Sequence, residues 1–72
     1  MTATYVFRVQ GMHCASCGML IDEALEDIPG VTCSTTSVKA GRTTVIADSR
    51  VGPTELAATI VAAGYVATHE ET

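Results

Sequence analysis

Two cysteines, Cys14 and Cys17, lie where the hydrophobic pattern of this chain changes its period. Before them, residues 5–10 alternate apolar and polar side chains, which is typical of a half-buried strand. After them, apolar residues recur every three or four positions and so share one face of an amphipathic helix. These positions are Ile21, Ala24, Leu25 and Ile28. We therefore expect the pair on a strand-to-helix turn, with Cys14 in the loop and Cys17 in the first helical turn.

That placement has a chemical consequence for the two thiols. The first turn of a helix carries backbone N–H groups without partners, and together with the helix dipole they favour a negative charge. An isolated cysteine thiol has a pKa of about 8.5, and a position at a helix start lowers it. More thiolate is then present at neutral pH, and the thiolate is both the nucleophile and the metal ligand.

The rest of the chain predicts an α+β fold in which two helices cover one face of a four-stranded antiparallel sheet. The further elements are expected as a strand over 31–39, a turn over 40–42, a strand over 43–48, a helix opened by Gly52-Pro53 with Leu56, Ile60 and Ala63 on its core face, and a strand over 65–68. The resulting order, βαββαβ, is that of the ferredoxin-like open-faced sandwich. Residues 69–72 are expected to form a polar tail.

Length and charge narrow the function classes. Seventy-two residues make one domain, with its core expected over residues 5–67. Eight acidic and four basic residues give a net charge of −4, which argues against a nucleic-acid partner because phosphate binding needs a basic face. Residues 1–4 carry no basic segment of a signal peptide, and no run approaches the ~20 apolar residues of a membrane span. We therefore expect a cytoplasmic protein without membrane insertion.

Three segments in order closely resemble the heavy-metal-associated (HMA) domain: Gly11-Met12-His13-Cys14-Ala15-Ser16-Cys17, then Ile28-Pro29-Gly30-Val31, then Gly64-Tyr65. That family comprises copper chaperones of the CopZ type and the N-terminal modules of P-type metal ATPases. The resemblance runs from about Tyr5 to Ala67. It implies a chaperone, not an enzyme, that holds Cu(I) between Cys14 and Cys17 and passes it by thiolate exchange to the metal-binding domain of a P-type copper ATPase. An excised ATPase module and a homodimer bridged by the metal are the alternatives it leaves open.

The cysteines themselves admit other interpretations. A disulfide scaffold is disfavoured, because three cysteines would leave one of them unpaired. A thioredoxin-like dithiol usually carries Trp before the pair and Pro within it, and this chain has neither. Two thiolates are soft ligands that select Cu(I) over hard cations, whereas Zn²⁺ prefers four ligands. The chain offers zinc only His13 and Cys33 in addition, so Zn²⁺, Hg²⁺ and Cd²⁺ stay open.

Residues around the pair are expected in supporting roles. By the resemblance, Met12 packs into the core and tethers the loop, while the Tyr65 ring shields the site. His13 is expected to project away from the ion, because it neighbours Cys14 in the sequence. Cys33 is expected on the solvent face of the sheet, away from the loop, as a thiol without function.

The first helix carries two further features. Met19 and Leu20 stand where the family more often has polar or basic residues. We expect one of them to pack inward and the other to contribute an apolar rim beside the metal. Four acidic residues of the same segment are expected either as a solvated face or as a means of steering a basic partner toward the thiols. They are Asp22, Glu23, Glu26 and Asp27.

Overall fold

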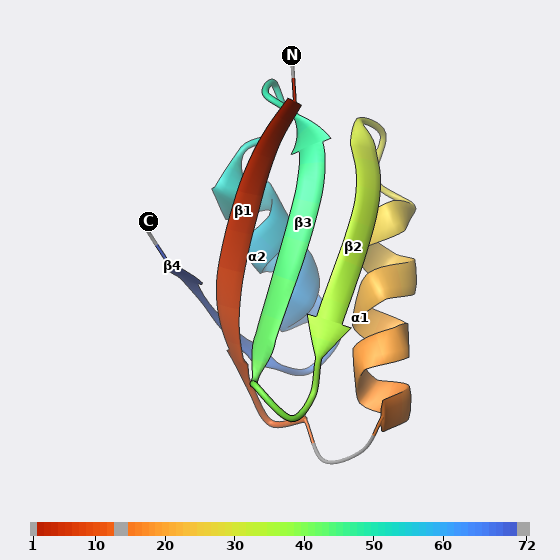
Figure 1. The fold of residues 1–72 in the computed structure, drawn as a ribbon, viewed down its shortest axis with the longest axis vertical. Helices are drawn as coiled ribbons and strands as arrows, with labels where there is room; N and C mark the ends of the chain where they lie inside the picture. The colour runs from red at the N-terminus through yellow and green to blue at the C-terminus, as the bar shows by residue number, and fades with distance from the viewer. Residues whose placement is uncertain (1, 13–14, 71–72) are drawn as a thin grey trace.

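The computed structural model describes residues 2–12 and 15–70, and Figure 1 shows a single sheet with both helices on its far side. The elements are β1 (Thr2–Gln10), α1 (Ala15–Glu26), β2 (Val31–Ser37), β3 (Arg42–Asp48), α2 (Pro53–Ala62) and β4 (Val66–Glu70). The strands are ordered β2-β3-β1-β4, and every neighbouring pair is antiparallel. The predicted ferredoxin-like βαββαβ architecture is thereby confirmed.

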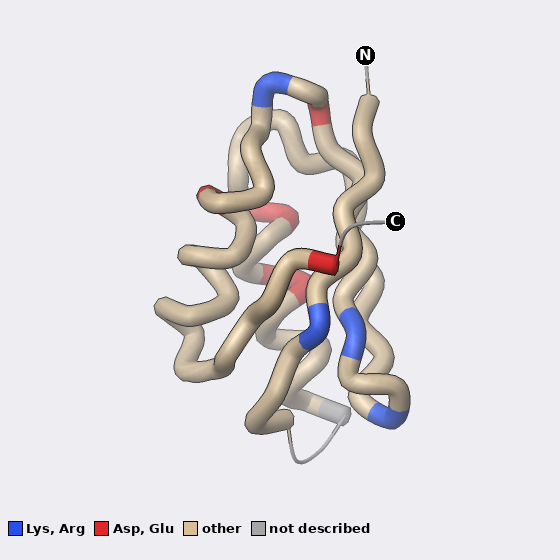
Figure 2. The backbone as a smooth tube through the Cα atoms, turned by 90° about the vertical axis from the view of Figure 1, so that its left-hand side faces the viewer, with Lys and Arg blue, Asp and Glu red and all other residues tan. Residues whose placement is uncertain are grey.

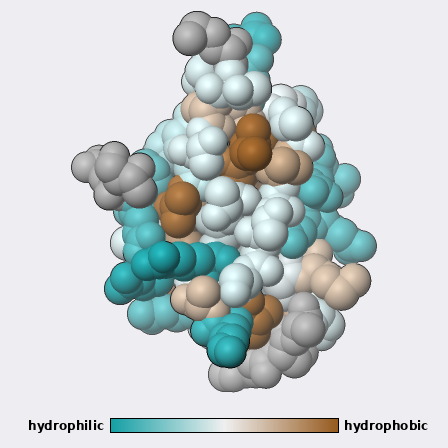
Figure 3. All heavy atoms as spheres, in the orientation of Figure 1, coloured by the Kyte–Doolittle hydropathy of each residue, from teal (hydrophilic) through white to brown (hydrophobic). Residues whose placement is uncertain are grey.

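The core lies between the sheet and the helices. Its fully buried apolar side chains include one aromatic ring, that of Phe7, and otherwise come from aliphatic residues. The core members are Phe7, Val9, Ile21, Leu25, Val45, Ala47, Val51, Leu56 and Ile60. Burial on one strand face and exposure on the other follows from the period-two alternation of β1 and β3. The sheet face turned to the viewer in Figure 3 is mostly polar, with separate apolar side chains.

The second helix ends earlier than its apolar pattern predicted. Leu56 and Ile60 are fully buried, but Ala63 is the C-cap residue and is exposed. The backbone turns at Gly64, whose φ of 102° suits a residue without a side chain. This turn connects α2 to β4. The assignment of Ala63 to the core face was therefore wrong.

The last strand runs further than predicted. It covers Val66–Glu70, so His69 and Glu70 belong to the sheet and not to a polar tail. Pairing with β1 explains the difference: His69 stands opposite Phe7, and its ring centroid lies 5.3 Å from that of Phe7. Glu70 accepts a hydrogen bond of 3.0 Å from the Arg8 guanidinium. Cross-strand partners thus extend the strand into residues whose polarity alone indicated a tail.

Candidate metal site

Cys17 lies in the first turn of α1, two residues after the helix begins, and is half-buried. The connection that precedes α1 leaves β1 at Gln10, so the cysteine follows a strand-to-helix turn as predicted. Cys14 and His13, the two other residues expected in that turn, lie outside the described residues. At Cys17 the backbone N–H groups of the helix start favour a negatively charged thiolate.

The segment before the cysteines is held against the core from one side. Gly11 has a φ of 98°, and a Cβ built on it would lie 3.6 Å from Cδ1 of Tyr65. Met12 and Tyr65 are both half-buried and packed against the core cluster. Met12 thus packs against the core, while its role as a tether of the loop stays a prediction. The structure also places the Tyr65 ring against the loop backbone.

The helix side of the site depends on a glycine that sequence reasoning missed. Gly18 follows Cys17 directly and is buried against β2 and the turn after it. A Cβ on Gly18 would lie 3.1 Å from Cγ2 of Val38 and 3.2 Å from Cγ2 of Thr36. The backbone of α1 thus approaches the sheet closely just beyond the cysteine. A glycine inside a helical pattern, where it is normally unfavourable, was the available signal.

Two of the four acidic residues of the first helical segment contact the neighbouring strand. Asp22 accepts hydrogen bonds from the Ser34 hydroxyl at 2.7 Å and from the Thr36 hydroxyl at 2.6 Å. Glu26 accepts one from the backbone N–H of Ser34 at 3.2 Å. These carboxylates therefore belong to the contact between α1 and β2, although Glu26 is also exposed to solvent. The half-buried Asp22 departs from the expectation of a solvated face.

Cys33 lies on the open face of the sheet. It pairs with Ile46 of β3, just after an irregularity in the pairing of β2 near Val31. Its thiol is half-buried, and it is not part of a disulfide with any described cysteine. The predicted position on the solvent face is thus confirmed. Within residues 2–12 and 15–70, no group of three or more His, Cys, Asp and Glu side chains comes together as a metal site.

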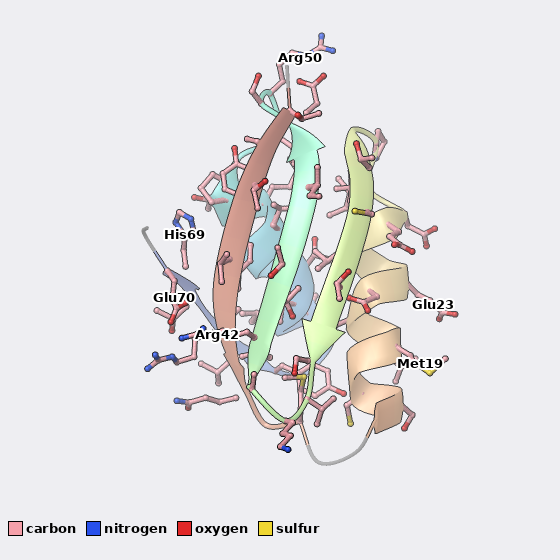
Figure 4. The ribbon with its side chains drawn as sticks, in the orientation of Figure 1. Met19, Glu23, Arg42, Arg50, His69 and Glu70 are labelled. Carbon is pink, nitrogen blue, oxygen red and sulfur yellow. The ribbon has the colours of Figure 1, made fainter. Side chains whose placement is uncertain are left out.

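Both apolar residues that follow Gly18 are exposed. Met19 is 66% exposed and Leu20 is 56% exposed, so the expectation that one of them packs inward was wrong. Figure 4 shows Met19 pointing away from α1 and from the sheet. Leu20 is three residues after Cys17 and is therefore its neighbour on the helix surface. An exposed apolar side chain, that of Leu20, therefore borders the half-buried cysteine.

The heavy-metal-associated domain family matches residues 6–66, from within β1 to the first residue of β4. The chain belongs to this family.

Individual HMA proteins and larger proteins are also similar to this chain. The mercuric reductase of Serratia marcescens is 35% identical over 60 residues, which is 83% of this chain but 13% of that protein. A CopZ metallochaperone superimposes with a TM-score of 0.87 at 28% identity and covers 92% of this chain and 100% of its own. A copper-binding domain from HMA7, a P-type ATPase, superimposes with a TM-score of 0.92 at 26% identity, covering 99% and 96%.

The chain is therefore a metal-binding HMA domain that resembles copper chaperones and the metal-binding domains of P-type ATPases. It spans about an eighth of the mercuric reductase that it matches. Neither helix within the described part of the chain is both long enough and apolar enough to cross a membrane.

Proposed function

We propose that this HMA domain is a cytoplasmic copper chaperone that holds Cu(I) between Cys14 and Cys17 and delivers it to the metal-binding domain of a transport ATPase. The observation that carries the proposal is the position of Cys17: half-buried, in the first turn of α1, directly after a strand-to-helix turn. A soft monovalent ion is satisfied by two thiolates, which is the donor set of a Cys-x-x-Cys pair. The similarity to a CopZ metallochaperone over its whole length supports the same conclusion.

Transfer proceeds by exchange of thiolate ligands. An incoming thiolate of the partner bonds to the two-coordinate ion, and one of the two original sulfur–metal bonds then breaks. A second thiolate of the partner replaces the remaining original bond in the same way, which completes the transfer. Cys17 is fixed on α1 by the close contact of Gly18 with β2, so it keeps its place during the exchange. The N–H groups of the helix start stabilise the thiolate that is released.

A mercury-binding module is the second candidate. The mercuric reductase similarity favours it, because Hg²⁺ is also a soft ion that thiolates bind.

A zinc site would need more ligands than the two cysteines. Cys33 is on the open sheet face opposite Ile46, and His13 is the remaining ligand that the sequence offers near the pair. An ATPase module has the same donor set as a chaperone, as the similarity to the HMA7 domain illustrates.

Serine substitution of each cysteine tests the ligand assignment. Under reducing, anaerobic conditions, Cys14→Ser and Cys17→Ser should each lose Cu(I) affinity by orders of magnitude, because one thiolate cannot complete even linear coordination. Cys33→Ser is the matched control, since it removes a half-buried thiol from the open face, and it should bind Cu(I) as the parent does. Equal losses in Cys33→Ser and Cys14→Ser would overturn the assignment.

Competition among metals tests the choice of cargo. The reduced protein is titrated with Cu(I), Hg²⁺ and Zn²⁺ against chelators of known affinity, with and without the substitution His13→Ala. For a copper site, the substitution should leave Cu(I) affinity within a few-fold, because two thiolates already satisfy the ion. For a zinc site, the substitution should lower Zn²⁺ affinity. It should also remove the pH dependence of that affinity that comes from a histidine, whose ordinary pKa is about 6.5. Zinc that outcompetes Cu(I) in the parent would refute the copper proposal.

A further inference from the structure

One side of α1 meets the outer edge of β2 at every fourth residue. Glu26 accepts a hydrogen bond from the Ser34 N–H at 3.2 Å. Asp22 accepts one from the Thr36 N–H, also at 3.2 Å. Gly18 is buried, and a Cβ built on it would lie 3.2 Å from Cγ2 of Thr36. These three residues of α1 share one side of the helix, because four residues make about one turn.

The spacings of the helix and the strand match. Four residues of an α-helix rise about 6.0 Å, and two residues of a strand span about 6.6 Å. A helix that offers a carboxylate every fourth residue can therefore meet a strand edge that offers an N–H every second residue. In Figure 2 the acidic positions of α1 follow one another along the helix, above the grey connection that precedes it. The two carboxylate contacts thus fix α1 along its own axis against β2.

Of the two carboxylates, that of Asp22 lies nearer the candidate metal site in the sequence and makes more contacts with β2. It also accepts hydrogen bonds from the Thr36 hydroxyl at 2.6 Å and from the Ser34 hydroxyl at 2.7 Å. Hydrogen bonds to a charged acceptor are roughly twice as strong as those between neutral groups. Asp22 therefore holds the helix firmly one turn after Gly18, and Gly18 follows Cys17 directly.

We infer that Asp22 is a positioning residue of the metal site, which acts through Thr36 to hold the first turn of α1, and with it Cys17, where two thiolates can share one ion. The inference rests on the proposed function, because it concerns the same pair of cysteines. A binding site must keep its ligands within about 0.5 Å of the productive geometry. Without the contact between Asp22 and Thr36, the start of α1 shifts relative to β2, and the Cys17 sulfur shifts with it.

Cu(I) competition with the reduced protein tests the inference. Asp22→Ala should weaken Cu(I) binding about tenfold, the low end of what the loss of a group that orients a metal ligand costs. Thr36→Val removes the hydroxyl at nearly constant shape and should also weaken binding. Thr36→Ser keeps the hydroxyl and should lie closer to the parent. The double variant Asp22→Ala/Thr36→Val should bind no more weakly than Asp22→Ala, because both changes break one contact, whereas independent effects would multiply.

Two control variants separate positioning from charge and from stability. Glu23→Ala removes the same charge at the next residue, which is exposed, and should stay within about twofold of the parent. Ile60→Val removes a methyl group from a fully buried side chain of α2. A variant that stays about 90% folded loses affinity by only about 1.1-fold through its unfolded fraction. Ile60→Val should therefore bind Cu(I) as the parent does, although it is less stable.

Amide hydrogen exchange gives a readout in the metal-free protein. The Thr36 N–H donates to Asp22 and the Ser34 N–H donates to Glu26. Asp22→Ala should therefore speed exchange at Thr36 more than at Ser34. Metal that binds better while the contact between Asp22 and Thr36 is closed must favour the closed contact by the same factor. In the unsubstituted protein, Cu(I) should thus slow exchange at Thr36 by about tenfold and at Ser34 by less.

The outcomes separate the two proposals. A parent protein that takes up no Cu(I) would overturn the proposed function at the loading step, and the same variants would then be compared with Hg²⁺. Parental affinity in a folded Asp22→Ala, or equal losses in Asp22→Ala and Glu23→Ala, would overturn the inference and leave the copper proposal standing. If Asp22→Ala did not fold, Thr36→Val and the exchange of the unsubstituted protein would decide. Parental affinity in Thr36→Val, or equal slowing at Thr36 and Ser34, would contradict the inference.

Discussion

Asp22 on α1 accepts hydrogen bonds from both the hydroxyl and the backbone N–H of Thr36 on β2, at 2.6 Å and 3.2 Å. β2 is an edge strand, so its outward N–H groups have no strand to pair with. The Asp22 carboxylate takes the place of that strand. Because the Thr36 hydroxyl donates to Asp22, its contact of 2.9 Å with the buried Thr43 is one in which Thr43 donates. One carboxylate thus orders a chain of hydroxyl groups that enters the core.

Substitution of Asp22 should therefore destabilise the protein more than its place in an acidic helix suggests. Asp22→Ala leaves the hydroxyls of Ser34 and Thr36 and one N–H without their acceptor, and we expect a loss of about 2 kcal/mol in the free energy of unfolding. Glu23→Ala is the matched control, because Glu23 is exposed and points away from the sheet in Figure 4. It should change stability by no more than about 0.5 kcal/mol. Urea denaturation of the metal-free proteins measures both, and similar losses would contradict the network.

The glycine before Met12 should matter for both stability and metal binding. Gly11 has a φ of 98°, a conformation that costs a residue with a Cβ about 1–2 kcal/mol. Gly11→Ala should lower the free energy of unfolding by that amount and weaken Cu(I) binding, because the relaxed backbone moves the loop away from Tyr65. Gly52→Ala is the control: Gly52 has a φ of −82°, and nothing lies within 4 Å of an added Cβ. Denaturation and Cu(I) competition should leave the Gly52 variant near the parent.

Asp48, the last residue of β3, should make the stability of the fold depend on pH in the acid range. The pKa of Asp48 is lowered from 3.8 to about 2, chiefly by the side-chain hydrogen bond from Arg50 and next by the bond from the Arg50 backbone N–H. Since the folded pKa lies below the unfolded one, the contact stabilises the fold above about pH 4 and is lost as the pH falls toward 2. Arg50→Gln removes the largest cause and should raise the Asp48 pKa part of the way to its ordinary value. An NMR titration that found no change in this variant would contradict the assignment.

Much of the fold was predictable because local patterns and tertiary packing agree. The alternation of β1 and the three-and-four spacing of Ile21 and Leu25 both indicate the face that the structure buries. Prediction was wrong at Ala63 and at residues 69–70, where the outcome depends on non-local contacts. Glu70 is polar in sequence, yet it joins β4 because Arg8 and Arg42 stand beside it on the sheet.

At the candidate site, the position of Cys17 at the start of α1 was predictable, but the contacts around it were not. Helix register alone places Cys17 in the first turn of α1, whereas the burial of Gly18 against Val38 depends on a hairpin twenty residues away. Asp22 shows the same limit. Its sequence position indicates only a place on the first helix, and the packing of α1 on β2 is needed to reveal its hydrogen bonds with Ser34 and Thr36.

Alkylation of the unmodified protein tests whether Cys14 and Cys17 bind the metal while Cys33 does not. Cys17 is half-buried in α1, so Cys14 in the preceding connection is expected to react with iodoacetamide before it. Cu(I) should protect Cys14 and Cys17 and leave the rate at Cys33 unchanged, because Cys33 faces Ile46 on the open sheet. Timed quenching followed by peptide mass mapping gives the three rates, and the double variant Cys14→Ser/Cys17→Ser provides the rate of Cys33 alone. Modification of Cys17 before Cys14 would contradict the loop geometry, and protection of Cys33 by Cu(I) would bring it into the metal site.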